Sequence, residues 1–377
     1  METLEEQSTD DRLAKLSVPI EIIEDILSRL PVESILRFRS VSKPWLSRIS
    51  DPSFTKLHFT RSTRTALFIS AYDDSTRQQH LLSAPRDGGP VSHLLTIDDV
   101  SQNDFRAAEH LNGLVLFTSV NSDSGYPCAY VVNPSTRKSL LLPHPDPYSH
   151  DIDETACYFF GFDESTNEHK VLMIRQFPKP ARFEIRIFSM STRSWRKIDA
   201  GPPIAFSISY GYICSVCVNS VIHLKFLDGL WCHILTFDLR TEVFSVINSP
   251  QGAPPYDGCF PHIIKANGCV GIAWRIIKNN QLRVWMLQDY ENCVWVREIY
   301  TEPLAEVCFP YPQDFVDTDE IICRPSKLSE NVMSVPVYNK KSRCFKSLHF
   351  TLGHLFPVSR NLRFYMVKSY DESMVPL

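Results

Sequence analysis

The repeating unit of this chain is clearest in residues 187–195, which read IFSMSTRSW. Two apolar residues end one strand, a polar cluster forms a turn, and an aromatic residue opens a second strand. Related units stand at residues 131–137 (VVNPSTR), 236–244 (TFDLRTEVF), 289–295 (DYENCVW) and 337–345 (VYNKKSRCF), with a weaker copy at 72–77 (YDDSTR). Each unit predicts a β-hairpin.

The spacing of the aromatic residue in these units is nearly constant. Successive positions are 49, 51 and 50 residues apart, at Trp195, Phe244, Trp295 and Phe345. A second hairpin signal, Asn-Gly or Asn-Ser before an apolar run, stands upstream at Asn112, Asn219 and Asn267. A repeat of about 50 residues with about four strands predicts one blade of a β-propeller. The chain beyond residue 65 has room for about six blades, each with a large aromatic side chain packed in it.

The first 60 residues have a different period. After Pro19, apolar side chains recur every three or four residues, at Ile20, Ile23, Ile26, Leu27 and Leu30, which predicts an amphipathic helix. Because proline suits the first turn of a helix, Pro31 and Pro44 predict the starts of a second and a third helix, the last ending at Asp51-Pro52. Three short helices bury too little apolar surface to be very stable alone, which indicates a partner.

Composition excludes several classes of protein. Among 377 residues, 39 basic and 43 acidic side chains give a net charge of −4, which argues against binding nucleic acid. No run approaches the roughly 18 apolar residues of a membrane helix, so no membrane partner is expected. Residues 1–15 are rich in acidic side chains and predict a disordered tail rather than a targeting peptide. The 11 cysteines are odd in number and scattered, which favours reduced thiols and a cytoplasmic or nuclear location.

The sequence contains no familiar catalytic motif. G-x-S-x-G, H-E-x-x-H and P-loop patterns are all missing from it. The best candidate for a metal site is Cys214-x-x-Cys217 with His223 and Cys232-His233, but residues three apart on a strand point to opposite faces. We therefore predict no catalytic residue, no metal and no cofactor.

The helical segment resembles an F-box over residues 16–45, LSVPIEIIEDILSRLPVESILRFRSVSKPW. The positions that match the family pattern are Pro19, Ile26-Leu27, Arg29-Leu30-Pro31, Val41, Lys43 and Trp45. The match continues at Ser53-Phe54 and His58. Val18 stands where leucine usually precedes the proline, a mild apolar exchange.

The remainder resembles the F-box-associated domain of plant F-box proteins, which is related to kelch repeats. The matching phrases are residues 112–114 (NGL), 133–137 (NPSTR), 161–171 (GFDESTNEHKV) and 187–198 (IFSMSTRSWRKI). The double glycine of many kelch repeats is missing from this sequence. We expect a small all-α F-box of three short helices at residues 16–60, followed by an all-β, kelch-like β-propeller of about six blades at residues 65–370.

Together, the resemblances imply a substrate-recognition subunit of an SCF-type E3 ubiquitin ligase, which is not itself an enzyme. The F-box would dock on a Skp-family adaptor, and through it reach the cullin scaffold, the RING subunit and the E2 conjugating enzyme. The propeller would bind a protein substrate destined for the proteasome. The residues that the resemblance assigns to adaptor docking are Pro19, Ile23, Ile26, Leu27, Leu30, Pro31, Val41, Lys43 and Trp45.

Two alternatives stay open for the propeller. It senses a small molecule or a glycan, or the protein is a non-proteolytic F-box scaffold. A pocket at the propeller mouth with aromatic walls and a few convergent polar groups favours a small ligand. A broad surface built from loops favours a protein substrate.

Overall fold

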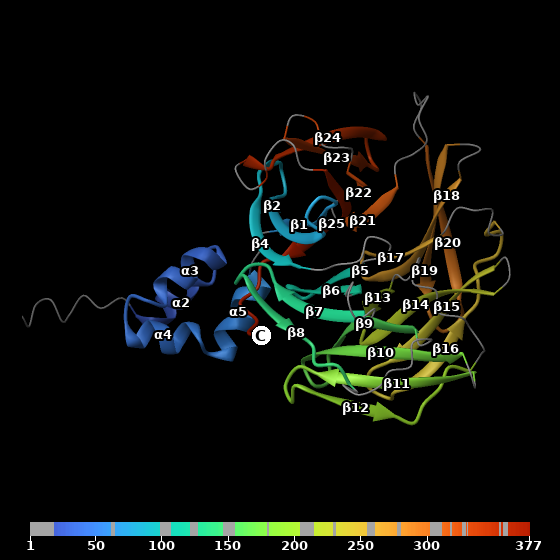
Figure 1. Ribbon diagram of the computed structural model, residues 1–377, viewed down its shortest axis with the longest axis horizontal. Helices are drawn as coiled ribbons and strands as arrows, with labels where there is room; N and C mark the ends of the chain where they lie inside the picture. The colour runs from blue at the N-terminus through green and yellow to red at the C-terminus, as the bar shows by residue number, and fades with distance from the viewer. Residues whose placement is uncertain are drawn as a thin grey trace, which may run out of the picture.

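Four short helices and a ring of six β-sheets make up the structure, a computed structural model (Figure 1). It describes residues 19–61, 65–98, 107–120, 127–145, 155–178, 181–203, 215–228, 231–254, 261–276, 280–301, 311–316, 319–325, 329, 331–353, 356 and 361–377. The tail expected at residues 1–15 lies outside these ranges. The expected fold class, a small helical domain followed by a propeller of six blades, is confirmed.

The helical domain has one helix more than expected. Its helices are α2 (Ile20–Leu27), α3 (Val32–Phe38), α4 (Lys43–Ile49) and α5 (Pro52–Arg61). Prolines precede α2 and α3, and the Ser42 hydroxyl caps α4 by accepting the Trp45 N–H at 3.4 Å. The third helix ends just before Asp51 and Pro52, as expected, but these two residues do not end the helical region. They start α5, because the Asp51 carboxylate accepts the Ser53 N–H at 2.8 Å.

The first three blades of the propeller follow the helices. From the innermost strand outward, blade 1 contains β25 (Leu362–Asp371), β1 (Thr65–Asp73), β2 (Gln78–Pro85) and β4 (Ser92–Ile97). Blade 2 contains β5 (Ala107–Leu111), β6 (Leu114–Val120), β7 (Pro127–Asn133) and β8 (Lys138–Leu141). Blade 3 contains β9 (Thr155–Asp163), β10 (Glu168–Pro178), β11 (Ala181–Ser189) and β12 (Ser194–Ile198).

The other three blades complete the ring. Blade 4 contains β13 (Ser215–Val218), β14 (Val221–Asp228), β15 (Trp231–Asp238) and β16 (Val243–Ile247). Blade 5 contains β17 (His262–Ala266), β18 (Cys269–Ile276), β19 (Gln281–Asp289) and β20 (Val294–Thr301). Blade 6 contains β21 (Pro312–Val316), β22 (Glu320–Cys323), β23 (Val332–Asn339) and β24 (Cys344–Thr351), with β3 (Gly89–Pro90) at its edge.

Blade 1 closes the ring by joining distant parts of the chain. Its innermost strand, β25, comes from the C-terminal region and pairs antiparallel with β1, so that Thr65 lies opposite Asp371. A second link joins blades 1 and 6, where β3 pairs in parallel with β24. These pairings remove two free sheet edges.

The hairpin turns explain why so few glycines are needed. The residue before the outgoing strand has a positive φ, between 51° and 59°, at Arg77, Arg137, Asn167, Arg193, Glu242, Cys293 and Arg343. An Asp or Asn side chain supports many of these turns. The Asp163 carboxylate, for example, accepts the Ser165 N–H at 2.9 Å. These short polar turns therefore hold non-glycine residues in a conformation that glycine adopts more easily.

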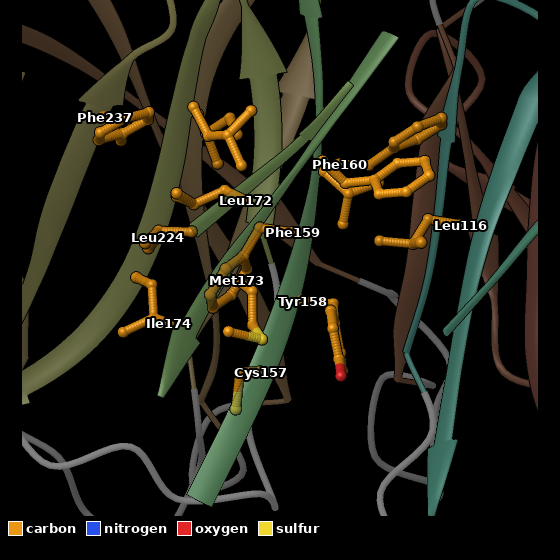
Figure 2. Packing of buried hydrophobic residues seen from close by; sticks show 14 of the residues in the cluster. Leu116, Cys157, Tyr158, Phe159, Phe160, Leu172, Met173, Ile174, Leu224 and Phe237 are labelled. Carbon is orange, nitrogen blue, oxygen red and sulfur yellow. The ribbon is translucent and has the colours of Figure 1, made fainter. Parts of the chain in front are cut away.

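Side chains from neighbouring blades form the core of the propeller. Figure 2 shows Leu116 of blade 2 facing Phe160 of blade 3, while Leu172 of blade 3 faces Leu224 of blade 4. The aromatic residues of the repeat pack as expected, with ring centroids 5.2 Å apart for Phe188 and Trp195, 4.7 Å for Phe237 and Phe244, and 5.0 Å for Tyr338 and Phe345. None of the described helices has the length and apolar character needed to span a bilayer.

Candidate functional site

Helix α2 is apolar on two sides. Ile23 and Leu27 face the core of the helical domain, where Leu27 is only 2% exposed. On the other side, one turn apart, Ile22 is 50% exposed and Ile26 is 53% exposed. Because a helix of an isolated domain normally exposes a polar face, the outward pair indicates a surface that another protein covers.

Further apolar side chains are exposed on the neighbouring elements. Val41 lies between α3 and α4, and Leu46 lies on α4. Together with Ile22 and Ile26, they are the exposed large apolar side chains of the described helical domain, and we call these four residues the outer apolar face. Ile22 and Leu46 were not among the residues expected from the sequence, although Ile22 precedes Ile26 by one helical turn and could have been found from that spacing.

The structure places the nine expected docking residues at three levels of exposure. Leu27 is buried, so it shapes the helical domain and does not reach its surface. Ile23, Leu30, Pro31 and Trp45 are half-buried, with the Trp45 ring 5.2 Å from that of Phe38. Pro19, Ile26, Val41 and Lys43 are exposed.

The core of the helical domain includes a residue from the C-terminus of the chain. Met374 is buried in one cluster with Leu27, Val32, Ile35, Ile49 and Phe54. Figure 1 shows the C-terminus beside α5. We call residues 372–377, which follow β25, the C-terminal strap.

Hydrogen bonds attach the strap to both domains. On the helical side, the Glu372 carboxylate accepts the Val32 N–H at 3.1 Å, at the start of α3, where a negative charge is favourable. On the propeller side, the Asn133 amide donates to the backbone oxygens of Ser373 at 3.1 Å and Val375 at 2.8 Å. The strap therefore fixes the helical domain against blade 2.

Gly113 of blade 2 makes room for the strap. Its φ is +81°, and a Cβ atom added there would lie 2.0 Å from the Cβ of Ser373. A side chain at this position would push the strap away from the propeller, so the Asn-Gly pair at residues 112–113 serves the domain junction as well as the hairpin.

A cavity of about 330 Å³ lies on the axis of the propeller. The innermost strands of all six blades contribute to its wall. Two acidic side chains in this wall join neighbouring blades. The Glu109 carboxylate accepts the Phe160 N–H at 2.8 Å and the Ser215 hydroxyl, and the Asp314 carboxylate accepts the Ser369 N–H at 2.7 Å.

Burial changes the titration of groups along this wall. It raises the pKa of Glu109, against the opposing effect of the hydrogen bond from Ser215. It also lowers the pKa of His110 to about 4. The neutral His110 ring accepts the N–H groups of Gly113 at 3.2 Å and Asp371 at 3.3 Å through Nε2, and so joins blade 2 to blade 1.

Thiol chemistry is disfavoured at the buried cysteines near this wall. Burial raises the pKa of Cys217 to about 11, so its thiol is protonated at neutral pH. Of the residues considered for zinc, Cys214 lies outside the described residues. Within the parts of the chain that the structure describes, no three His, Cys, Asp or Glu side chains are arranged to hold a metal ion.

Two family matches, together with the fold, identify this chain as an F-box protein with a β-propeller. Residues 16–57 match the F-box domain, and residues 57–365 match the F-box associated beta propeller domain. The second match spans most of the chain, which therefore belongs to the F-box associated beta propeller family.

Relatives in Arabidopsis thaliana agree with this assignment. A predicted F-box protein is 29% identical over 305 residues, which cover 77% of this chain and 73% of the relative. An F-box protein is 28% identical over 330 residues, with 77% and 73% covered. Among solved structures, TolB from Acinetobacter baumannii has a TM-score of 0.50 at 12% identity, over 85% of this chain and 73% of its own, which shows a similarity of fold alone.

Proposed function

We propose that this protein is a substrate-recognition subunit of an SCF-type ubiquitin ligase. The outer apolar face carries this proposal, because it is exposed on helices that match the F-box domain. A Skp-family adaptor would cover Ile22, Ile26 and Leu46 and would link the chain to the cullin scaffold, the RING subunit and the conjugating enzyme. Exposed apolar anchors of this kind supply most of the energy of a protein interface.

In this role the chain positions a substrate and supplies no reacting group. A substrate held on the propeller is brought close to the charged conjugating enzyme, which raises the effective concentration of its lysines to about the millimolar range. The C-terminal strap supports this role, since it holds the helical domain and blade 2 together through Met374, Glu372 and Asn133. Such a subunit would act in the cytoplasm or the nucleus.

A second candidate function is the sensing of a small molecule by the propeller. The axial cavity favours it, because about 330 Å³ lies at the lower end of the volumes of ligand pockets. Phe160, Phe315 and Tyr370 are among the residues that line it, beside Glu109 and Asp314. A non-proteolytic scaffold remains the third candidate.

Proximity labelling separates proteolysis from the other two functions. The full chain fused to a labelling enzyme is compared with the Ile26→Glu variant, with and without a proteasome inhibitor. A substrate receptor predicts labelled proteins whose abundance rises with the inhibitor and also rises in the variant. Labelled proteins whose abundance responds to neither change would contradict the proteolytic function and favour a scaffold.

The control variant carries the same substitution at a similarly exposed site. Val243 lies on β16, the outermost strand of blade 4, far in sequence from the helical domain. Because it is 55% exposed, close to the 53% of Ile26, a charged side chain there is expected to be as compatible with folding as one at Ile26. Val243→Glu is expected to behave as the wild type does.

A further inference from the structure

The charges around the axial cavity are not all used within the protein. Three cationic side chains line it, Arg86, Lys265 and Lys368. Arg86 pairs with Glu320 at 3.1 Å. Lys265 has no ion pair or hydrogen bond among the described residues, and Lys368 lies 3.8 Å from Asp314, beyond hydrogen-bond distance.

The acidic groups of the cavity are already committed to the fold. Glu109 accepts hydrogen bonds from blades 3 and 4, and one oxygen of Asp314 accepts both the N–H and, at 2.5 Å, the hydroxyl of Ser369. Asp371 is also engaged in an interaction of its own. These carboxylates hold neighbouring blades together, and Asp314 also forms a long ion pair with Lys368, which leaves Lys265 as the lysine of the wall without an ion pair among the described residues.

The two lysines act on the same part of the wall. After burial, which is the main cause, the positive charges of Lys265 and Lys368 both lower the pKa of His110, against the opposite effect of Asp314. Lys265 also lines a smaller adjoining cavity of about 90 Å³, with Asn112 and Cys217 shared between the two. Since Lys265 is exposed, it can be reached from this side.

We propose that the axial cavity binds a carboxylate between the ammonium groups of Lys265 and Lys368. Its volume of about 330 Å³ admits a small dicarboxylic acid or the last residue or two of a peptide. Both ligands present the same chemical group, a carboxylate that the two cations would bind through charge-assisted hydrogen bonds. This inference stands whether or not the helical domain binds an adaptor.

Two probes distinguish the sources of the carboxylate. Succinate represents a free dicarboxylic acid, and a fluorescent peptide with a free C-terminus, compared with its amidated form, represents the end of a substrate. Both are titrated into the full chain, by calorimetry for succinate and by fluorescence anisotropy for the peptides. Binding of succinate assigns the site to a free acid, and binding of the free-terminus peptide over the amidated peptide assigns it to a chain end.

Three variants test the residues. Lys265→Gln and Lys368→Gln each remove one ammonium group and are expected to weaken binding about tenfold or more. Lys197→Gln is the matched control, because Lys197 is exposed on the outermost strand β12 and has no ion pair among the described residues. Higher salt should weaken binding to the wild type as well.

The proposal is overturned if neither probe binds, or if Lys265→Gln binds as tightly as the wild type. It is also overturned if Lys197→Gln weakens binding as much as the two cavity variants do. Should Lys368→Gln fail to fold, Lys265→Gln decides the test alone, since Lys265 is exposed and has no ion pair or hydrogen bond among the described residues.

Discussion

Met374 connects the stability of the F-box to the C-terminus of the chain. Its side chain is 6% exposed and is one of six buried residues in the core of the helical domain. We predict that Met374→Ala destabilises this domain selectively, although residue 374 is more than 300 positions away from the helices in sequence. The propeller should stay folded, because its own clusters do not contain Met374.

The size of the effect follows from the burial of the side chain. Replacing a buried methionine by alanine costs about 2 to 5 kcal/mol, since apolar contacts are lost and a cavity remains. Because each 1.4 kcal/mol changes an equilibrium constant about tenfold, the equilibrium constant for local opening of α2 to α5 should rise by about 30-fold or more. A core of only six residues has little capacity to absorb such a loss.

Native-state hydrogen exchange measures this opening directly. Amides of α2, α3, α4 and α5 should exchange at least about 30-fold faster in Met374→Ala, while amides in blades 3 to 5 keep their rates. Met366→Ala is the matched control, because Met366 is buried to a similar extent in β25 but packs within the propeller. If the helices exchange at the wild-type rate in Met374→Ala, or equally fast in both variants, the strap does not hold the F-box.

Three further predictions concern the propeller and its pH dependence. Burial lowers the pKa to about 4, 4, 4 and 3, respectively, in His110, His169, His223 and His262. The unfolded chain protonates histidine near pH 6.5, whereas the folded protein keeps these rings neutral. The free energy of unfolding should therefore fall by about 2 kcal/mol or more between pH 7 and pH 5. Glu109 opposes the change, because its raised pKa lets the folded protein bind a proton before the unfolded chain does. An unchanged urea midpoint would contradict this. Arg193→Gly should raise the free energy of unfolding by about 0.5 to 1 kcal/mol, because glycine relieves the positive φ of 51° at some cost in chain entropy; a lower urea midpoint would refute the strain. Lys170→Met should cost about 3 to 5 kcal/mol, because it leaves Asp163 (2% exposed) without the cation 2.7 Å away, whereas Arg37→Met, at an exposed pair, should change little; equal effects in urea denaturation would refute this reading.

Local features of the structure could be predicted from the sequence because they depend on neighbouring residues. The turn at residues 189–194 and its relatives follow from polar side chains that bond to nearby backbone groups. The aromatic at the start of each outgoing strand then marks the blade. The F-box helices begin at prolines for a similarly local reason.

Helix α5 was missed because its pattern is weak. Only Phe54 and His58 of its ten residues are buried, one turn apart, and the rest are polar or partly exposed. The signal that could have shown it is the Asp51-Pro52-Ser53 start, which combines a capping carboxylate with a proline in the first turn.

Long-range features lay beyond the sequence. The pairing of Thr65 with Asp371 and the insertion of Met374 among the helices join segments with no local pattern in common. Within α2, periodicity marks apolar positions but does not say that Leu27 points inward while Ile26 points outward, since both sides of this helix are apolar. The axial cavity takes one or a few residues from each of six strands, so no single segment reveals it.

Binding of a Skp-family adaptor to the full chain is the measurement that tests the central claim most directly. The wild type, Ile26→Glu and Val243→Glu are titrated with purified adaptor by calorimetry, after their circular dichroism spectra are shown to agree. We predict a one-to-one complex for the wild type and Val243→Glu. For Ile26→Glu we predict an affinity about 30-fold lower or worse, since a charge buried in an apolar interface costs about 2 kcal/mol or more. No complex with the wild type, or equal affinity for all three, would contradict the assignment of the outer apolar face to adaptor docking.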